Sequence, residues 1–65
     1  MKLLLQIDCE NAAFEDDCNG EIARILRVAA KIAKNDPRAM AAGTRLRDIN
    51  GNNVGYMQID DTAAN

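Results

Sequence analysis

Residues 21–34, EIARILRVAAKIAK, constrain the fold more than any other stretch of the sequence. Apolar residues recur along it at helical spacing, and basic residues recur at the same spacing on another side. The apolar residues are Ile22, Ile25, Leu26, Ala29, Ile32 and Ala33, and the basic residues are Arg24, Arg27, Lys31 and Lys34. The pattern predicts one amphipathic helix over residues 18–34, with an apolar face for a sheet and a basic face for water or an anion.

The ends of this helix carry recognisable signals. Asp17 is expected to cap its start, because a carboxylate there accepts hydrogen bonds from the free amides of the first turn. Pro37 stops the helix after Asn35 and Asp36. Residues 38–43, RAMAAG, show no period, and we interpret them as a loose loop or a fraying turn.

Two further stretches are expected to form strands. Residues 2–8, KLLLQID, alternate so that Leu3, Leu5 and Ile7 share one apolar face, with Leu4 as a stray apolar residue on the other. Residues 44–60 are expected to form a β-hairpin around Asn50-Gly51, because both residue types tolerate positive φ. A bulge is predicted at Gly55, and residues 61–65 are expected to fray.

These elements predict an α+β fold. A small two-layer β-α-β-β domain follows from them, in which a three-stranded sheet packs on one amphipathic helix. Strand order 1-3-2 is favoured because it makes every pairing antiparallel, while a parallel pairing of the first two strands stays possible. Residues 1–65 are expected to form a single domain.

The composition indicates a thin margin of stability. The chain has 65 residues, of which eighteen are Leu, Ile, Val, Phe, Tyr or Met. A domain this small usually adds disulfides, a metal ion or a second copy of itself. With no histidine and two cysteines, Cys9 and Cys18, we expect no metal site and no cofactor. The start of the chain is unlike an export signal, so we expect a cytoplasmic protein with free thiols. Homo-oligomerisation, as a dimer or a larger assembly, is therefore the source of additional stability that we expect.

The charges are separated along the chain. Residues 8–21 hold six acids and no base, whereas residues 24–47 hold seven bases and one acid. The net charge of −2 argues against indiscriminate binding of nucleic acid, and no apolar run is long enough to span a membrane. Acids from Asp8 to Glu21 could occupy a basic groove of a partner protein, and the basic side of the helix could meet an acidic one.

No enzyme motif is present. The chain has neither histidine nor serine, and both thiols lie in the acidic segment, which raises rather than lowers the pKa of a cysteine. We therefore expect no catalytic residues. The residue types favour a binding protein instead, because arginine pairs with phosphate and because amides and aromatic rings recognise a base or a ribose. The candidate ligand-binding residues are Arg45, Arg47, Asn50, Asn52, Asn53, Tyr56, Asn11 and Phe14.

Two of these assignments have alternatives. Phe14 is either an anchor that holds its loop on the core, which we favour, or an aromatic platform with Asn11 at a binding site. An anion has an alternative site in Arg24, Arg27, Lys31 and Lys34 of the helix, although the nearby acids compete with phosphate there.

Three segments, NAAF at residues 11–14, EIARILR at residues 21–27 and LRDINGNNVG at residues 46–55, together resemble a group of short proteins encoded by phages and prophages of Gram-negative bacteria. Cys18 stands where that pattern has a proline. The resemblance implies a bacterial host cell as the setting. It implies no enzymatic activity, because none is established for the group.

In that setting we expect a non-catalytic counter-defence protein that sequesters a nucleotide-like host signal in a pocket between subunits. The alternative is a protein-interaction inhibitor of a host defence or transcription complex.

Overall fold

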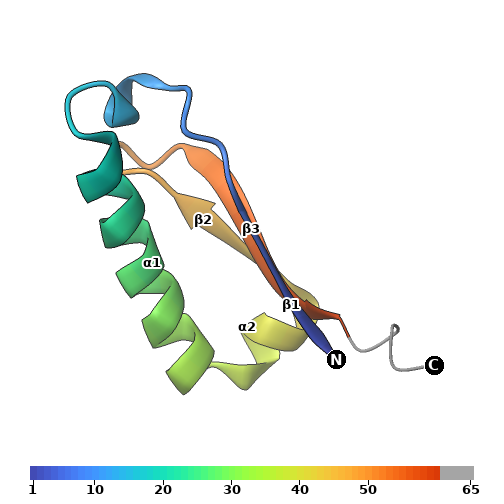
Figure 1. Cartoon of the computed structure of the whole chain (residues 1–65). Helices are drawn as coiled ribbons and strands as arrows, with labels where there is room; N and C mark the ends of the chain where they lie inside the picture. The colour runs from blue at the N-terminus through green and yellow to red at the C-terminus, as the bar shows by residue number, and fades with distance from the viewer. Residues whose placement is uncertain (61–65) are drawn as a thin grey trace.

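The computed structural model describes residues 1–60, which form a sheet with helices on one side (Figure 1). The elements in chain order are strand β1 (Lys2–Ile7), 3₁₀ helix η1 (Ala12–Phe14), helix α1 (Cys18–Asn35), helix α2 (Pro37–Ala42), strand β2 (Thr44–Arg47) and strand β3 (Asn53–Asp60). The tail predicted to fray, residues 61–65, lies outside the described residues.

The three strands form one antiparallel sheet in the order β1-β3-β2, which confirms the predicted topology. Strand β3 is central because the hairpin joins it to β2 and because β1 pairs along its other side. Leu3 lies opposite Ile59, and Ile7 lies opposite Gly55. The predicted bulge is present, since Leu46 pairs with Gly55 but the next residue, Arg47, pairs with Asn53.

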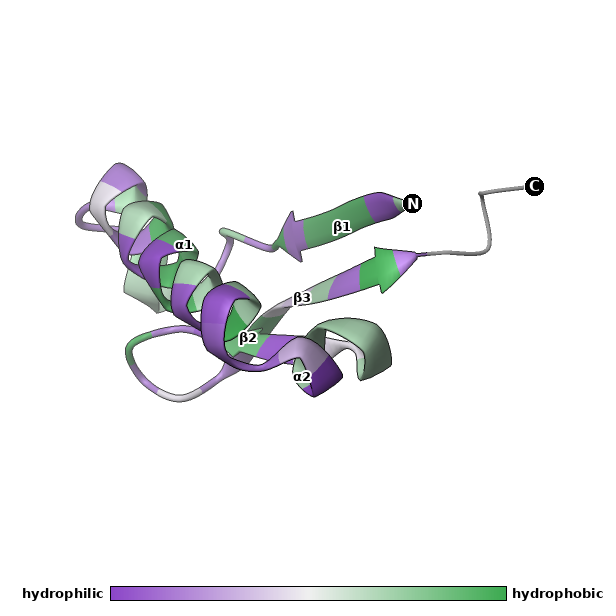
Figure 2. Ribbon diagram, turned by 90° about the horizontal axis from the view of Figure 1, so that it is seen from below, coloured by the Kyte–Doolittle hydropathy of each residue, from purple (hydrophilic) through white to green (hydrophobic). Residues whose placement is uncertain are grey.

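Helix α1 confirms the element predicted from the apolar period. The side chain of Asp17 caps it by accepting a hydrogen bond from the Gly20 amide at 3.0 Å. Ile25 and Ala29 of α1 are buried against Leu46 of β2 and Met57 of β3. Figure 2 shows the hydrophobic and hydrophilic residues of α1 on different sides of the helix.

The loose loop predicted for residues 38–43 is wrong, because α2 occupies Pro37–Ala42. Asp36 ends α1 and also caps α2, accepting a hydrogen bond from the Ala39 amide at 3.1 Å. Pro37 takes the first position of α2, where its missing N–H costs nothing. Met40 anchors this short helix in the core, and Gly43 ends it at a φ of 92°.

The turn of the hairpin is longer than a two-residue Asn-Gly turn. The Gly51 amide donates to the Asp48 carbonyl at 3.0 Å, and the Asp48 amide donates to the Asn52 carbonyl at 2.9 Å. Gly51 has positive φ, at 86°, and no other residue of the hairpin at residues 44–60 does. This is a three-residue loop in which Gly51 supplies the left-handed residue.

Strand β1 is less covered than the alternation of its side chains predicts. Leu3, Leu4 and Leu5 are 56%, 47% and 38% exposed, so the expectation of a buried face with a single stray Leu4 is wrong. Helix α1 packs against η1, α2 and β2 rather than over β1, so the inner side of β1 is exposed at Leu3 and Leu5, whereas Ile7 packs against the core. In Figure 2, β1 is largely hydrophobic along its length.

Candidate functional site

A buried carboxylate organises the hairpin turn. Asp48 is 4% exposed, and one of its oxygens accepts hydrogen bonds from the Asn50 and Asn52 amides at 2.9 Å each. The other oxygen accepts from the side-chain amide of Asn11 at 2.6 Å and from that of Asn52 at 3.2 Å. Burial alone would raise the pKa of Asp48, but these four hydrogen bonds outweigh it and hold the pKa below its ordinary value.

A second buried carboxylate joins the helix to the same turn. Glu21 is 7% exposed, and it accepts two hydrogen bonds from the guanidinium of Arg24, at 2.6 and 3.1 Å. It also accepts one from the Ile49 amide at 2.8 Å. Pairing with Arg24 lowers the pKa of Glu21 in spite of its burial, and the Ile49 bond adds to the effect. The same pairing raises the pKa of Arg24.

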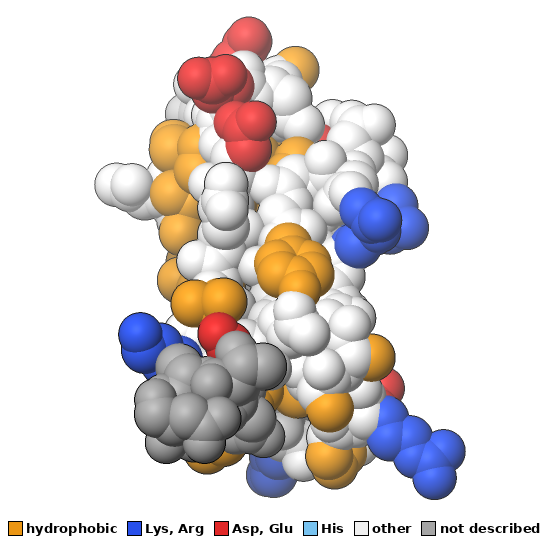
Figure 3. Space-filling view, turned by 90° about the vertical axis from the view of Figure 1, so that its right-hand side faces the viewer, with side chains coloured by type: hydrophobic (Ala, Val, Ile, Leu, Met, Phe, Trp, Pro, Cys, Tyr) orange, Lys and Arg blue, Asp and Glu red, His pale blue; other side chains and the backbone are white. Residues whose placement is uncertain are grey.

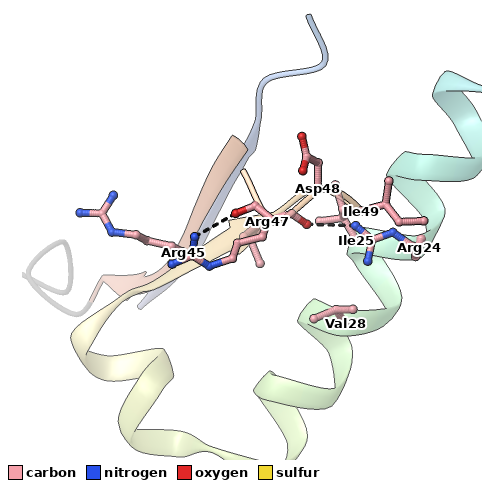
Figure 4. A pocket seen from close by; sticks show the side chains of 9 residues that line it. Arg24, Ile25, Val28, Arg45, Arg47, Asp48 and Ile49 are labelled. Carbon is pink, nitrogen blue, oxygen red and sulfur yellow. Dashed lines mark hydrogen bonds between the residues drawn. The ribbon is translucent and has the colours of Figure 1, made fainter. Parts of the chain in front are cut away.

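Arginines from both sides of this turn meet at one pocket. Arg24 of α1 donates to the carbonyl of Arg47 at 3.0 Å, and Arg47 donates to the carbonyl of Gly51 at 3.2 Å. Between α1 and the end of β2 lies a pocket of about 320 Å³, which we name the arginine pocket. Figure 4 shows Arg24 and Val28 on α1 and Arg47 on β2 beside it, whereas the side chain of Arg45 extends from β2 away from α1. Its lining is Arg24, Ile25, Val28, Arg45, Leu46, Arg47, Asp48, Ile49 and Gly51.

The arginine pocket combines positive charge with an apolar wall. Arg24 is held by Glu21, but Arg47 uses one of its five guanidinium donors within residues 1–60. The guanidinium of Arg45 has no hydrogen-bond or ion-pair partner within residues 1–60. Val28 and Ile49, which line the same pocket, are 43% and 68% exposed. Such a surface suits an anion that carries a flat or apolar group.

Three of the predicted ligand-binding residues meet at a second hollow, on the face of the sheet away from α1. Arg45, Asn53 and Tyr56 line it with Gln6 and Asp8, and its volume is about 290 Å³. Tyr56 is 42% exposed, and its hydroxyl donates to the side chain of Gln58. Arg45 lines both hollows, since it lies on the edge strand that separates them.

Other predicted site residues have structural roles. Phe14 is 3% exposed in the core, as the anchor interpretation predicts, so its ring offers no platform at the surface. The side chains of Asn11 and Asn52 are engaged by Asp48. In the alternative basic set, Arg24 lines the arginine pocket, whereas Arg27, Lys31 and Lys34 lie exposed on α1 outside it.

The two cysteines lie near each other at the start of α1. Both are free thiols. Burial raises the pKa of Cys9, and the adjacent Cys18 thiol and the charge of Asp8 raise it further. The direction agrees with the effect expected from the acidic segment. Within residues 1–60, no group of Cys, Asp and Glu side chains is arranged to hold a metal ion, and no helix there is long and apolar enough to cross a membrane.

Comparison with known proteins finds no family model, no curated protein and no solved structure that matches this chain. The resemblance to short phage proteins therefore stays a prediction.

Sequence patterns alone did not identify the roles of Glu21 and Asp48. Asp48 carried a usable signal, because Asp followed by Ile-Asn-Gly-Asn is typical of a turn in which the carboxylate bonds the following amides. The sequence around Glu21 gives no such signal beyond its place near the helix start, since its hydrogen bond with the Ile49 amide joins residues far apart in the sequence.

Proposed function

We propose that this chain is a non-catalytic binding protein that sequesters a nucleotide-like anion in the arginine pocket. One observation carries the proposal: helix α1 and edge strand β2 bring Arg24 and Arg47 to one cavity that also has an apolar wall, with Arg45 in its lining. Guanidinium groups supply donors for a phosphate, and Val28 and Ile49 supply a surface for a base.

The polar groups around the pocket support a binding role. Glu21 and Asp48 are fully engaged in hydrogen bonds that fix the turn and Arg24, so they hold the pocket in shape. A preformed pocket binds with a smaller entropic cost than one that must be ordered by its ligand.

The pocket belongs to a single subunit in this proposal. Every residue of its lining comes from one chain, whereas the sequence led us to expect a pocket shared between subunits. The phage resemblance implies a bacterial host cell as the setting, and in that setting the proposed role is sequestration of a host signal by a cytoplasmic homo-oligomer.

A second candidate function is inhibition of a host protein. Its support is the acidic loop between β1 and α1, where Asp8, Glu10 and Glu15 are all exposed. Figure 3 shows acidic side chains gathered at one end of the molecule. Such a cluster complements a basic groove on a partner.

Isothermal titration with a cyclic dinucleotide and with ADP-ribose tests the proposal, with inorganic phosphate and adenosine as partial ligands. We expect heat of binding with a whole nucleotide and its loss in Arg47→Ala. Arg27→Ala removes the same charge outside the pocket and is expected to bind as the unmodified chain does. Absence of binding to any nucleotide at millimolar concentration, or equal loss in both variants, contradicts the proposal. Capture of a host protein without nucleotide binding favours the second function.

A further inference from the structure

We propose that β1 pairs with β1 of a second copy of this chain, so that two three-stranded sheets join into one antiparallel sheet across a two-fold axis. The inference rests on the homo-oligomer in the proposed function and identifies the surface that forms it. It does not depend on a ligand, because the arginine pocket lies at the other edge of the sheet, beside β2.

The backbone of β1 is open on one side. Within residues 1–60, β3 is its sole neighbour in the sheet. The Asp8 amide donates to the Val54 carbonyl at 2.7 Å and continues the register of β1 on β3. Because residues of an antiparallel strand alternate in direction, Leu4 and Gln6 also bond β3, whereas Leu3 and Leu5 turn their amides and carbonyls to the open side. An edge with unpaired backbone groups is a template for another strand.

The side chains at this edge are apolar, unlike those at the opposite edge. Leu3, Leu4 and Leu5 are all exposed on β1, whereas Arg45 and Arg47 stand on β2. Charged residues on an edge strand oppose pairing with another chain, and a leucine-rich edge lacks that protection. In Figure 3, hydrophobic side chains gather along the upper part of the left margin of the sheet face.

One register satisfies both the backbone and the side chains. With the two-fold axis beside Leu4, Leu3 lies opposite Leu5 of the partner subunit and can exchange both backbone hydrogen bonds with it. The leucines of each face then meet leucines of the same face. Lys2 comes diagonally across from Asp8 of the partner subunit, within reach of a long side chain. The edge is therefore complementary to itself in hydrogen bonds, apolar contact and charge.

The apolar groove beside this edge fits the same arrangement. Leu3 and Met1 form part of a hollow of about 510 Å³ with Ala33 of α1, Met40 of α2 and Ile59 of β3. A second sheet continuing past β1 would bring further leucines to the margin of this hollow. Burial of apolar surface is favourable, and within residues 1–60 the core of one chain contains seven buried apolar residues.

Sedimentation velocity of the full chain at low and high micromolar concentration tests the inference. We expect a dimer that Leu4→Lys converts to a folded monomer, because the substitution sets two like charges opposite each other at the axis. Leu26→Lys is the matched control, since Leu26 is 44% exposed on α1, and it is expected to leave the dimer intact. A monomer at all concentrations, or dissociation by Leu26→Lys alone, overturns the proposal.

A cross-linking test does not depend on how Leu4→Lys folds. In a chain with Cys9→Ala and Cys18→Ala, Leu4→Cys is expected to form a disulfide-linked dimer on mild oxidation. Opposed Cα atoms in a non-hydrogen-bonded pair are about 4.5 Å apart, at the short end of the range for disulfides. Leu26→Cys is expected to stay monomeric. Failure of Leu4→Cys to cross-link overturns the β1 pairing and leaves nucleotide titration as a separate test of the pocket.

Discussion

Alanine at Gly55 is expected to destabilise the chain more than alanine at Gly51, although both glycines belong to the same hairpin. A Cβ atom at Gly55 would lie well inside the contact distance of the Gln6 carbonyl oxygen and 3.3 Å from the Cα of Ile7. Carbon and oxygen normally approach to about 3.3 Å, so β1 would have to move by about 1 Å. No side-chain rotation relieves this contact, because both obstacles are backbone atoms.

The losses of stability expected for the two alanine variants have different causes. Overpacking of this kind costs about 3 kcal/mol, a large part of the roughly 3–10 kcal/mol expected for a domain of this size. At Gly51 a Cβ atom meets nothing within 4 Å, and the cost comes from its φ of 86°, about 1–2 kcal/mol for an L-residue. Both variants therefore lose stability, one through β1 and the other through the turn.

Urea unfolding followed by far-UV circular dichroism measures both costs. We expect a lower midpoint for Gly55→Ala than for Gly51→Ala, together with a smaller dependence on urea if β1 has detached before unfolding. Amide hydrogen exchange of β1 is expected to rise in Gly55→Ala alone. Equal midpoints, or a larger loss in Gly51→Ala, would refute the close approach of β1 to Gly55.

Two further predictions concern titratable groups. Glu21 and Asp48 have pKa values below their ordinary values of 4.5 and 3.8, so their contribution to stability is present above pH 5 and is lost as the pH falls through about 4 and below. The urea midpoint should therefore fall between pH 7 and pH 3, and Asp48→Asn should differ from the unmodified chain less at pH 3 than at pH 7; an equal difference at both would contradict this. Cys9 has a raised pKa and is partly buried whereas Cys18 is exposed, so mass-spectrometric mapping at neutral pH should find Cys18 alkylated before Cys9, and the reverse order would contradict it.

The strand order and the main helix could be predicted because each follows from a strong local pattern. The apolar period of residues 21–34 admits one structure, and two short strands around Asn50-Gly51 must be neighbours. Helix α2 was missed because six residues are too few to show a period. Its signal was the pair Asp36-Pro37, which fits the cap and first position of a helix as well as the end of the preceding one.

The sequence predicted the types of residue at the candidate site better than it predicted which of them lie together. Arg45 and Arg47 were singled out because arginine suits an anion, and both line the arginine pocket. The contribution of Arg24 was not predicted for this pocket, because it depends on contacts across the fold. Glu21 fixes Arg24, and Arg24 then bonds the carbonyl of Arg47. Sequence spacing gives no access to pairings of this kind.

The exposed leucines of β1 agree with the shortage of large apolar residues in the sequence. The sequence indicates too few large apolar residues for a well-filled core, and the structure shows three leucines of β1 left outside that core. Apolar surface that a chain exposes on an unpaired strand is buried only when another chain covers it. If β1 pairs as proposed, dimerisation adds its free energy to that of folding, and the stability of the domain depends on its concentration. The edge at β2, which lines the arginine pocket, is then free in both subunits, so that one dimer has two independent arginine pockets.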